Sequence, residues 1–549
     1  MTTPTPRLEA ALARFGAQPG VTPDQEAQLR DAVTGDVDRL AEFNRQADAG
    51  QLTGFALEAP GGAPNRTGTY DKAAGVVTLP RASFHPTGPV PTTDLDAVLG
   101  VQTMSVDFAY KTWQDAAGNT QPVDQDMVDN LQSTLNRSPV LAEQIKEAWT
   151  QGHVRHFSLL PHGAAAGGTY DGNEAAVDGT PKGINLPPLG LQTGSSSNLQ
   201  GAYNARDMTF VLGHEIQHGF NDATSDSRRA IFLQDINRQG LALGSVHDYS
   251  DELRAYIRGV REDEAIANIA GWNALLSRER EISPNAIGLD LMHQISNGRI
   301  EDFVEADPQN WNKAIPKPGY SFNSDGSLAP TPGNIEAAAQ YYFDRPSSLY
   351  ASLGQRGVGL GLSHSDDYTN YYGNWALEQV FKAENRANVL HNGARPVISI
   401  DMAGLGLKED LLERGGLDLG SNKTPRAYLD TSTTPATPGF FHHTQDSSMG
   451  HALQHVPITA GPVAPSGDPM VDRWITALQA GDHAGARAAQ QAFARSGQGQ
   501  ALWDAALDDA RSHDSPNQGH AAESGHRQRD PEPARPVQHH AQDGHAMMR

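Results

Sequence analysis

The sequence predicts an α+β protein in which short strands precede long helices. Short segments such as "GTYDKAAGVVTLP" and "GINLPP" have the pattern and the terminal proline of brief strands. Longer segments, such as residues 94–113 and 224–300, place apolar residues at helical spacing. A loop rich in glycine and serine, residues 191–204, separates the last predicted strand from the first of the long helices. We therefore expect the order strand, loop, helix near the centre of the chain.

Residues 1–150 are predicted to form a mostly helical accessory region. The first 50 residues have a helical pattern, in which Thr22 is the expected N-cap and Gly50 ends the last helix. Brief strands follow at residues 54–60 and 68–80, and helices at residues 94–113 and 123–152.

Residues 151–300 are predicted to begin with strands at "VRHFSLLP", "GGTYDG" and "GINLPP" and to continue with long helices. The segment "GTYDGNEAAVDGTPKGINLP" resembles the earlier "GTYDKAAGVVTLP", which is a weak indication of an internal duplication. Residues 301–460 are rich in loops around two helical segments, and residues 461–512 have the pattern of a helical hairpin. Residues 513–549 contain almost no large apolar side chains and are predicted to be disordered.

The composition limits the possible functions. A chain of 549 residues is long enough for several packed units, and its formal net charge of 42 − 65 = −23 disfavours nucleic acid as a partner. Because there is no cysteine, any metal ligands must be His, Asp or Glu. The start lacks the pattern of a secretory signal and no apolar run approaches membrane-spanning length, so we expect a cytoplasmic protein without membrane insertion. Export by a leaderless secretion system would leave no such signal, and the sequence does not indicate an oligomeric state.

The segment "TFVLGHEIQHGFND", residues 209–222, has the spacing of a metal-binding helix. Four residues are slightly more than one turn, so His214 and His218 share a face and can both bind one Zn²⁺ ion. Glu215 lies about 100° round the helix, where it can act as a general base without being a ligand. The surrounding apolar residues predict burial of this helix, and Gly213 allows close approach of a neighbouring element. A chance occurrence of the motif is the alternative.

A third ligand is expected from the segment "REDEAIANIAGWNAL" on a second helix. Glu264 is our choice, with Glu262 as the alternative, although such an acidic run is more commonly a solvated helix face. Asn268 lies one turn after Glu264 and could accept a hydrogen bond from the outer ring N–H of a ligand histidine.

These two helical segments resemble the metal-ligand helices of the gluzincins, and "VLGHEIQHGFND" is most similar to the neprilysin-type zinc endopeptidases. The segment "GGTYDGNEAAVDGTPKGINLPPLGLQ" resembles the substrate-binding edge strand of that family, and "HSDDYTNYYG" resembles the segment with its transition-state histidine. The resemblance covers about residues 165–385. It implies a zincin-like core in residues 151–300, with a loop-rich catalytic subdomain in residues 301–460.

The resemblance also implies further roles. His364 would bind the oxyanion of the transition state, with Tyr371 and Tyr372 as alternative donors. The edge strand would align an extended peptide through Thr169, Tyr170 and Asp171, or through the neighbouring segment from Lys182 to Asn185. Two residues depart from the family, because Asn268 stands where the family has aspartate and Asn370 where it has the substrate-binding arginine.

The function predicted from the sequence is zinc-dependent endopeptidase activity on peptide or protein substrates. Zinc would activate a water molecule, and Glu215 would take its proton and pass it to the leaving amine. One alternative is a zinc hydrolase that cleaves non-protein amides such as cell-wall peptides. A second alternative is a catalytically idle zincin-fold binding protein. The helical flanking regions would suit a secreted bacterial effector.

Overall fold

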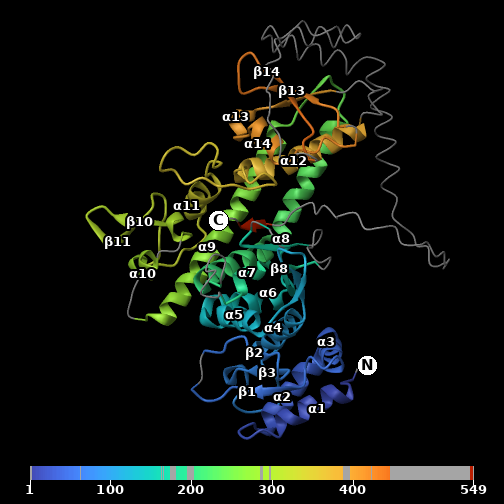
Figure 1. Ribbon diagram of the computed structural model, residues 1–549, viewed down its shortest axis with the longest axis vertical. Coiled ribbons are helices and arrows are strands. Elements are labelled where there is room, and N and C mark those ends of the chain that lie inside the picture. Colours follow the sequence, from blue (N-terminus) through green and yellow to red (C-terminus); the bar gives the residue numbers. More distant parts are fainter. Residues whose placement is uncertain are drawn as a thin grey trace, which may run out of the picture. The chain divides into compact units, whose positions relative to one another are not determined.

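The computed structural model describes residues 3–61, 64–161, 164, 166–172, 181–193, 203–284, 288–295, 298–387, 396–421, 423–445 and, for the backbone alone, 545–547 (Figure 1). The chain divides into two compact units. Unit 1 comprises Met1–Asp226, Val260–Arg345 and Asp543–Arg549, and unit 2 comprises Ser227–Gly259 and Pro346–Gln542. Helices and several small sheets occur together in the described residues, which agrees with the predicted α+β class.

Each unit combines stretches from several of the predicted regions, because the long helices α8 (Ala205–Gly240) and α9 (Ser250–Ile282) each continue from one unit into the other. The helical hairpin predicted for residues 461–512 lies outside the described residues. Of the tail predicted to be disordered, residues 545–547 form strand β15, because backbone pairing with another strand requires no apolar side chains.

The first part of unit 1 runs as far as α6. It contains α1 (Pro6–Gly16), α2 (Pro23–Gly35), α3 (Val37–Asp48), β1 (Gly54–Leu57), β2 (Thr69–Asp71), β3 (Val76–Leu79), η1 (Arg81–Ser83), α4 (Thr93–Ala109), β4 (Thr112–Gln114), β5 (Thr120–Pro122), α5 (Gln125–Arg137) and α6 (Pro139–Thr150). The predicted N-cap Thr22 is confirmed: its hydroxyl accepts from the Gln25 backbone N–H, and Gln25 bonds back to the Thr22 N–H. The helix predicted for residues 94–113 is wrong at its end, where Thr112 already belongs to β4.

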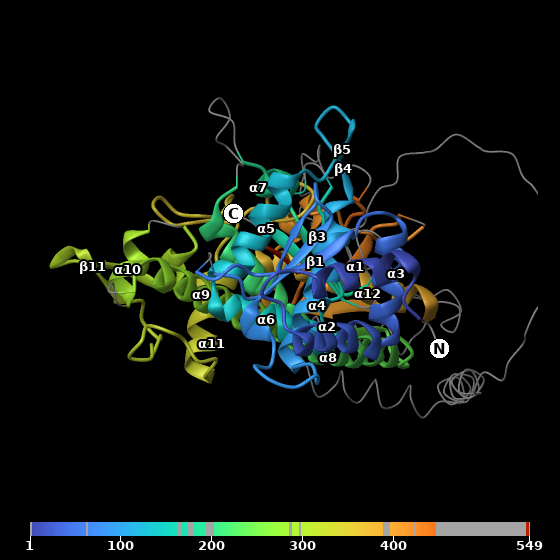
Figure 2. The same ribbon diagram turned by 90° about the horizontal axis from the view of Figure 1, so that it is seen from below.

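The remainder of unit 1 holds the metal helices. Besides α8 and α9 it contains β6 (His156–Leu159), β7 (Gly168–Asp171), β8 (Gly183–Leu186), α7 (Pro188–Leu191), α10 (Leu289–Gln294), η2 (Ile300–Asp302), β10 (Val304–Asp307), β11 (Asn310–Pro316), α11 (Pro332–Ala338), the π-helical turn η3 (Ala339–Phe343) and β15 (His545–Met547). One apolar cluster extends through the unit from Leu8 to Ala339. Figure 2 shows α1 and α3 beside β1 and β3 in this cluster.

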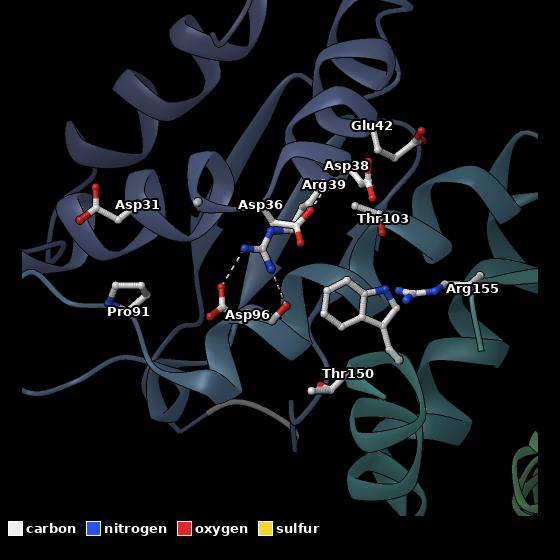
Figure 3. A pocket seen from close by; sticks show the side chains of 12 residues that line it. Asp31, Asp36, Asp38, Arg39, Glu42, Pro91, Asp96, Thr103, Thr150 and Arg155 are labelled. Carbon is white, nitrogen blue, oxygen red and sulfur yellow. Dashed lines mark hydrogen bonds and ion pairs between the residues drawn. The ribbon is translucent and has the colours of Figure 1, made fainter. Parts of the chain in front are cut away.

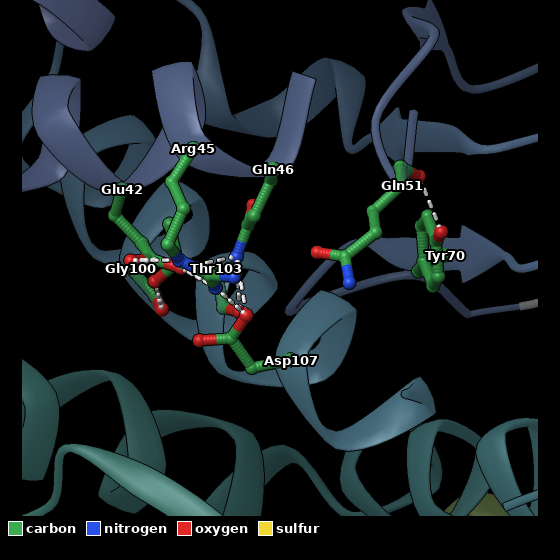
Figure 4. A network of polar contacts seen from close by, with 8 residues as sticks. All are labelled: Glu42, Arg45, Gln46, Gln51, Tyr70, Gly100, Thr103 and Asp107. Atoms are coloured by element: carbon green, nitrogen blue, oxygen red, sulfur yellow. Dashed lines mark hydrogen bonds and ion pairs between the residues drawn. The ribbon is translucent and has the colours of Figure 1, made fainter. Parts of the chain in front are cut away.

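Two sheets of unit 1 have the same topology. β1 pairs in parallel with β3, and β2 pairs with β3 in antiparallel orientation; β6, β8 and β7 repeat this arrangement in the same chain order. In both sheets the sequence "GTYD" supplies the strand that is antiparallel to the central one. The hydroxyl of Tyr70 donates to the Gln51 carbonyl at 2.5 Å (Figure 4), and that of Tyr170 donates to the His153 carbonyl at 2.9 Å. The predicted similarity of the two segments therefore extends to their strand pairing.

The helices that follow the two sheets are also alike. α4 contains the sequence Val-Leu-Gly at residues 98–100, and α8 contains it at residues 211–213. Aligned on this sequence, Val101, Gln102 and Ser105 stand where α8 has His214, Glu215 and His218. We call residues 51–109 the first copy and residues 153–222 the second copy. At the three aligned positions, imidazole and carboxylate side chains occur in the second copy alone.

Unit 2 is built on a separate sheet of order β14-β13-β12-β9. Its elements besides α8 and α9 are β9 (Val246–Asp248), α12 (Tyr368–Ala387), β12 (Val397–Ile400), α13 (Met402–Leu405), α14 (Glu409–Arg414), β13 (Arg426–Asp430) and β14 (Thr437–Phe441). The long helical region predicted for about residues 224–300 is interrupted here, because α8 ends at Gly240 and β9 precedes α9. α12 packs against α14, and Phe381 of α12 lies 5.7 Å from the ring of Phe441.

Candidate metal centre

The predicted metal helix is the first half of α8. His214 and His218 lie one turn apart on one face, with ring centroids 4.6 Å apart, and both side chains are fully buried. The predicted apolar packing is confirmed, since the neighbouring residues Phe210, Val211, Leu212 and Ile216 have no exposed surface. A pair of imidazoles is therefore held inside an apolar core rather than on a solvated helix face.

Two glycines allow α9 to cross close to this helix. A Cβ atom at Gly213 of α8 would lie 2.7 Å from the Ala274 Cβ and 3.3 Å from the Gly271 Cα. A Cβ atom at Gly271 of α9 would lie 2.8 Å from the Phe210 carbonyl oxygen. The close approach predicted from Gly213 is confirmed, and it brings the acidic turn of α9 next to the two histidines.

Glu264 is the acid that reaches them. Its Oε2 lies 3.3 Å from His214 Nε2 and 3.9 Å from His218 Nε2. One ligand atom from each of the three residues lies within 4.8 Å of the other two. Tetrahedral coordination with bonds of about 2.0–2.1 Å places ligand atoms roughly 3.3 Å apart, so the three atoms have the spacing of a metal site. The alternative Glu262 is partly exposed and does not belong to this group. His214, His218 and Glu264 could hold a metal ion.

Asp263 is the hydrogen-bond partner of a ligand histidine. Its Oδ2 lies 3.0 Å from His218 Nδ1, and its side chain is buried. The prediction that Asn268 has this role is not met for His218, because Asp263 lies at Nδ1 of that ring. Asn268 is buried, and neither atom of its amide has a hydrogen-bond partner among the described residues.

The buried charges shift one another's pKa values. Burial raises the pKa of Glu215 to about 8, and Glu264 adds to this effect, whereas His218 and Arg299 oppose it. Burial lowers the pKa of His218, but the carboxylates of Asp263, Glu264 and Glu215 outweigh it and raise the value to about 9. Since a metal ligand must be neutral imidazole, a cation binding here would displace the His218 proton. The backbone N–H of Tyr170 on β7 also lowers the pKa of Glu215, so the glutamate is directed at the predicted substrate strand.

The predicted substrate strand packs directly on the metal helix. A Cβ atom at Gly168 of β7 would lie 2.6 Å from Val211 Cγ1 and 3.4 Å from Glu215 Oε1. Thr169, Tyr170 and Asp171 all belong to β7, and Thr169 accepts a hydrogen bond of 3.0 Å from the buried Asn185 amide. The alternative segment from Lys182 to Asn185 contains the start of β8, which pairs with β7 and with β6, and its substrate-binding role stays a prediction.

The residues predicted to bind the oxyanion belong to unit 2. His364 is exposed, has a φ of 53° and donates its backbone N–H to the Gly361 carbonyl at 3.2 Å. Tyr371 and Tyr372 lie on α12 with ring centroids 5.3 Å apart. Asn370 donates to Asp367 and accepts from the Lys408 N–H at 2.7 Å, so it fixes the loop before α14. The catalytic role of His364, Tyr371 or Tyr372 stays a prediction.

Tyr342 is a neighbour of the metal centre that the sequence analysis missed. Its buried ring meets the His214 ring edge-on, with centroids 5.9 Å apart, and it lies in the π-helical turn η3. Such turns frequently occur at functional sites. The segment "NIEAAAQYYFDR" was predicted as a plain helix, and only the break in helical geometry distinguishes it.

Other polar groupings lie apart from these residues. A hollow of about 690 Å³ contains Arg39, which donates to the Asp96 carboxylate and carbonyl (Figure 3). A network beside it joins Arg45 and Gln46 of α3 to Asp107 of α4 (Figure 4). Neither includes a residue of the metal centre. In unit 2, Glu409, Glu413 and His442 form a second group whose atoms lie within 4.8 Å.

No described helix has both the length and the apolar character needed to cross a membrane. Comparison with known proteins gives no relative: no protein-family model, no curated protein and no solved structure matches the chain.

Proposed function

We propose that the protein is a zinc metallopeptidase with a zincin-like core. His214, His218 and Glu264 hold the ion, and Glu215 is the general base. The observation that carries the proposal is that ligand atoms of two imidazoles and a carboxylate lie within 4.8 Å of one another, and that the helix with both imidazoles also carries the fully buried Glu215. Two nitrogens and one carboxylate are a ligand set that zinc hydrolases use, with a fourth position left for water or substrate.

The side chains divide the chemical work. When bound, zinc supplies Lewis acidity, which activates water and polarises the scissile carbonyl. Glu215 takes a proton from the attacking water and gives it to the leaving amine. Asp263 accepts from His218 Nδ1 and keeps Nε2 directed at the ion.

The substrate of this site is an extended peptide. β7 contacts the metal helix at Val211 and Glu215, so a chain that pairs with the outer edge of β7 passes beside the general base. Tyr342, whose ring contacts His214, is the candidate donor for the oxyanion within unit 1. His364, Tyr371 and Tyr372 stay candidates on the resemblance alone.

Metal analysis of the purified chain, together with cleavage of a peptide library, tests the proposal. We expect zinc in the protein, chelator-sensitive cleavage, and a Glu215→Gln variant that keeps zinc but loses turnover by at least about 10³-fold. Glu262→Gln, which changes a partly exposed acid on α9, is the matched control and should retain both properties. Equal cleavage by wild type and Glu215→Gln would overturn the mechanism, and cleavage of cell-wall fragments alone would overturn the peptide substrate.

A further inference from the structure

The outer edge of β7 is occupied by the chain's own C-terminal segment. The sheet has the order β15-β7-β8-β6, and β15 is formed by His545–Met547. The pairing is antiparallel, with His545 opposite Tyr170, Ala546 opposite Thr169 and Met547 opposite Gly168. A segment from the far end of the sequence therefore runs along the strand that contacts Glu215.

The pairing of β15 with β7 is important because β7 packs against the metal helix. Gly168 is in van der Waals contact with the metal helix, since a Cβ atom there would lie 3.2 Å from Glu215 Cγ. Paired strands lie about 4.8 Å apart, so a strand on the outer edge of β7 is one strand removed from the general base. This is the path that the proposed function assigns to a peptide substrate.

The first copy shows how the same edge is closed permanently. In β2, the backbone N–H and carbonyl of Tyr70 both bond to the Gln132 side chain, and the Lys72 N–H donates to Gln125 Oε1 at 2.8 Å. Asn136 donates to the Gly68 carbonyl at 3.1 Å. These amides project from one face of α5, which is part of the folded core. The corresponding backbone groups of β7 are met by a separate segment instead.

A three-residue strand is a weak ligand. Each net hydrogen bond shifts such an equilibrium by roughly 2- to 12-fold, and ordering the segment offsets part of that gain. The segment is attached to the same chain, which raises its effective concentration, but a longer peptide with more pairing residues can displace it. Its occupancy of β7 is therefore reversible, unlike the side-chain closure of β2.

We propose that the edge of β7 is a docking site for extended peptides and that residues 545–547 are its intramolecular ligand. Recognition uses backbone pairing, so the partner is defined by an extended conformation more than by its side chains. If the proposed peptidase function holds, on which this second part rests, the C-terminal segment competes with substrate and lowers activity until it is displaced.

A disulfide cross-link tests the docking without any activity assay. The chain has no cysteine, so Thr169→Cys combined with Ala546→Cys introduces a single pair, and residues that face each other across antiparallel strands have Cα separations of about 4.5–5.5 Å, within the range of a disulfide. We expect rapid formation of an intrachain disulfide under mild oxidation. Thr169→Cys with Ala541→Cys is the matched control and should cross-link at least about tenfold more slowly. Equal rates in the two variants, or a cross-link between two copies, would overturn the proposal.

Hydrogen exchange provides a second measurement in case the cysteine variants fold poorly. His545→Pro removes the backbone donor of β15 that faces β7, and Ala541→Pro is its control. The reason is that Tyr170, the partner of His545, corresponds to Tyr70, whose N–H and carbonyl point to the outer edge of the first sheet. We expect His545→Pro alone to increase exchange of the β7 amides, with the β2 amides of the first copy unchanged as an internal reference. Identical β7 exchange in wild type and His545→Pro would contradict docking.

Activity separates the two parts of the proposal. In a chain that cleaves peptides, His545→Pro should raise kcat/KM by roughly 5- to 10-fold, as expected when a segment held by one or two net hydrogen bonds is released. An unchanged kcat/KM together with a fast cross-link would overturn self-inhibition. If no variant cleaves any peptide, the proposed function fails, while the cross-link and the exchange data still decide whether β15 docks on β7.

Discussion

His218 has a different neighbour at each ring nitrogen. Nδ1 lies 3.0 Å from Asp263 Oδ2, and Nε2 lies 3.9 Å from Glu264 Oε2. A carboxylate at Nδ1 favours the tautomer with its proton there and leaves the Nε2 lone pair for a metal ion. Asp263 therefore affects both the orientation and the electron density of the His218 ring, without being a metal ligand itself.

We predict that Asp263→Asn weakens zinc binding about 10- to 100-fold, which is the usual effect of losing a charged partner of a ligand histidine. The amide still accepts a hydrogen bond from His218 Nδ1, so the fold should persist. Competition with a chromogenic chelator measures the affinity, and circular dichroism checks the fold.

Glu262→Gln is the control for this change, because it neutralises the neighbouring acid on the same turn of α9. Its zinc affinity should equal that of wild type. If Asp263→Asn and Glu262→Gln bind zinc equally well, the Asp263 carboxylate does not act through His218.

In unit 2, Glu378 of α12 gives a pH-dependent contribution to stability. Burial raises its pKa to about 7, although Lys382 and the Asp418 N–H act in the opposite direction. Because this value exceeds 4.5, the ordinary pKa, the folded chain binds the proton more tightly than the unfolded chain. The stabilisation is complete below about pH 4.5 and is lost as the pH rises through 7.

We predict that Glu378→Gln removes this dependence. The variant should exceed wild type in free energy of unfolding by about 2–3 kcal/mol above pH 7, and the difference should disappear towards pH 4.5. Urea unfolding at a series of pH values measures the effect. A constant difference between the two proteins across that range would contradict it.

At the scale of single residues, the sequence predicts what depends on local spacing. His214, Glu215 and His218 lie within one turn and a half of one helix, so the motif defines their relation before any tertiary contact is known. Asp263 and Tyr342 could not be assigned in this way. Their relation to the histidines depends on how α9 and η3 pack against α8, and neither residue has a distinctive spacing of its own.

At the scale of elements, the metal centre depends on the crossing of α8 and α9. A methyl group at Gly213 would lie 2.7 Å from the Ala274 Cβ and 3.2 Å from the Ala270 carbonyl oxygen. The helices must separate to admit it, and this moves Glu264 away from the histidines. Glycine is otherwise unfavourable within a helix, so its presence here indicates that the close approach outweighs helix propensity.

We predict that Gly213→Ala destabilises the chain by about 1–3 kcal/mol through overpacking and also weakens zinc binding. Thermal unfolding with and without zinc measures both effects. Gly333→Ala is the matched control, because that glycine lies in α11 with no atom within 4 Å of an added Cβ. It should be neutral or stabilising, and an equal loss in both variants would show that the crossing tolerates a methyl group.

Several elements could not be predicted because their pattern is too short or their partner is distant. β9 has three residues and β12 has four, which is too short for a recognisable alternating pattern. The two strands pair with each other although they lie far apart in the sequence. β15 lies in a tail with almost no large apolar residues, and only pairing with β7 makes it a strand. The strands β7 and β8, by contrast, were predicted correctly because glycine and proline mark their ends.

At the scale of the whole molecule, the two copies in unit 1 share strand pairing but differ in chemistry. Val101 and Ser105 of α4 cannot replace the two histidines, and the Ser105 hydroxyl already donates to the Val101 carbonyl at 3.0 Å. Gln102 at the position of Glu215 is buried and donates to the Thr67 carbonyl at 2.7 Å. The first copy therefore supports the fold without a metal ion.

The group of Glu409, Glu413 and His442 in unit 2 has weaker features as a metal site. Glu409 Oε2 accepts from the Tyr428 hydroxyl at 2.6 Å, and Glu413 Oε1 accepts from His442 Nδ1 at 3.0 Å. These hydrogen bonds compete with a cation for one oxygen of each carboxylate. Moreover, the His442 side chain is 51% exposed, so hydration competes with coordination. The buried group in unit 1 is therefore the better candidate for a metal site.

The comparison of the buried group in unit 1 with the exposed group in unit 2 predicts one tightly bound zinc ion per chain. Atomic emission of the purified protein after extensive dialysis should give one equivalent, and His218→Ala should reduce it to near zero because a site with two protein ligands binds zinc far more weakly than one with three. His442→Ala, the control in unit 2, should leave one equivalent. A full equivalent that survives His218→Ala but not His442→Ala would place the metal in unit 2. Glu215 would then have no metal-bound water to deprotonate, and the proposed mechanism would fail.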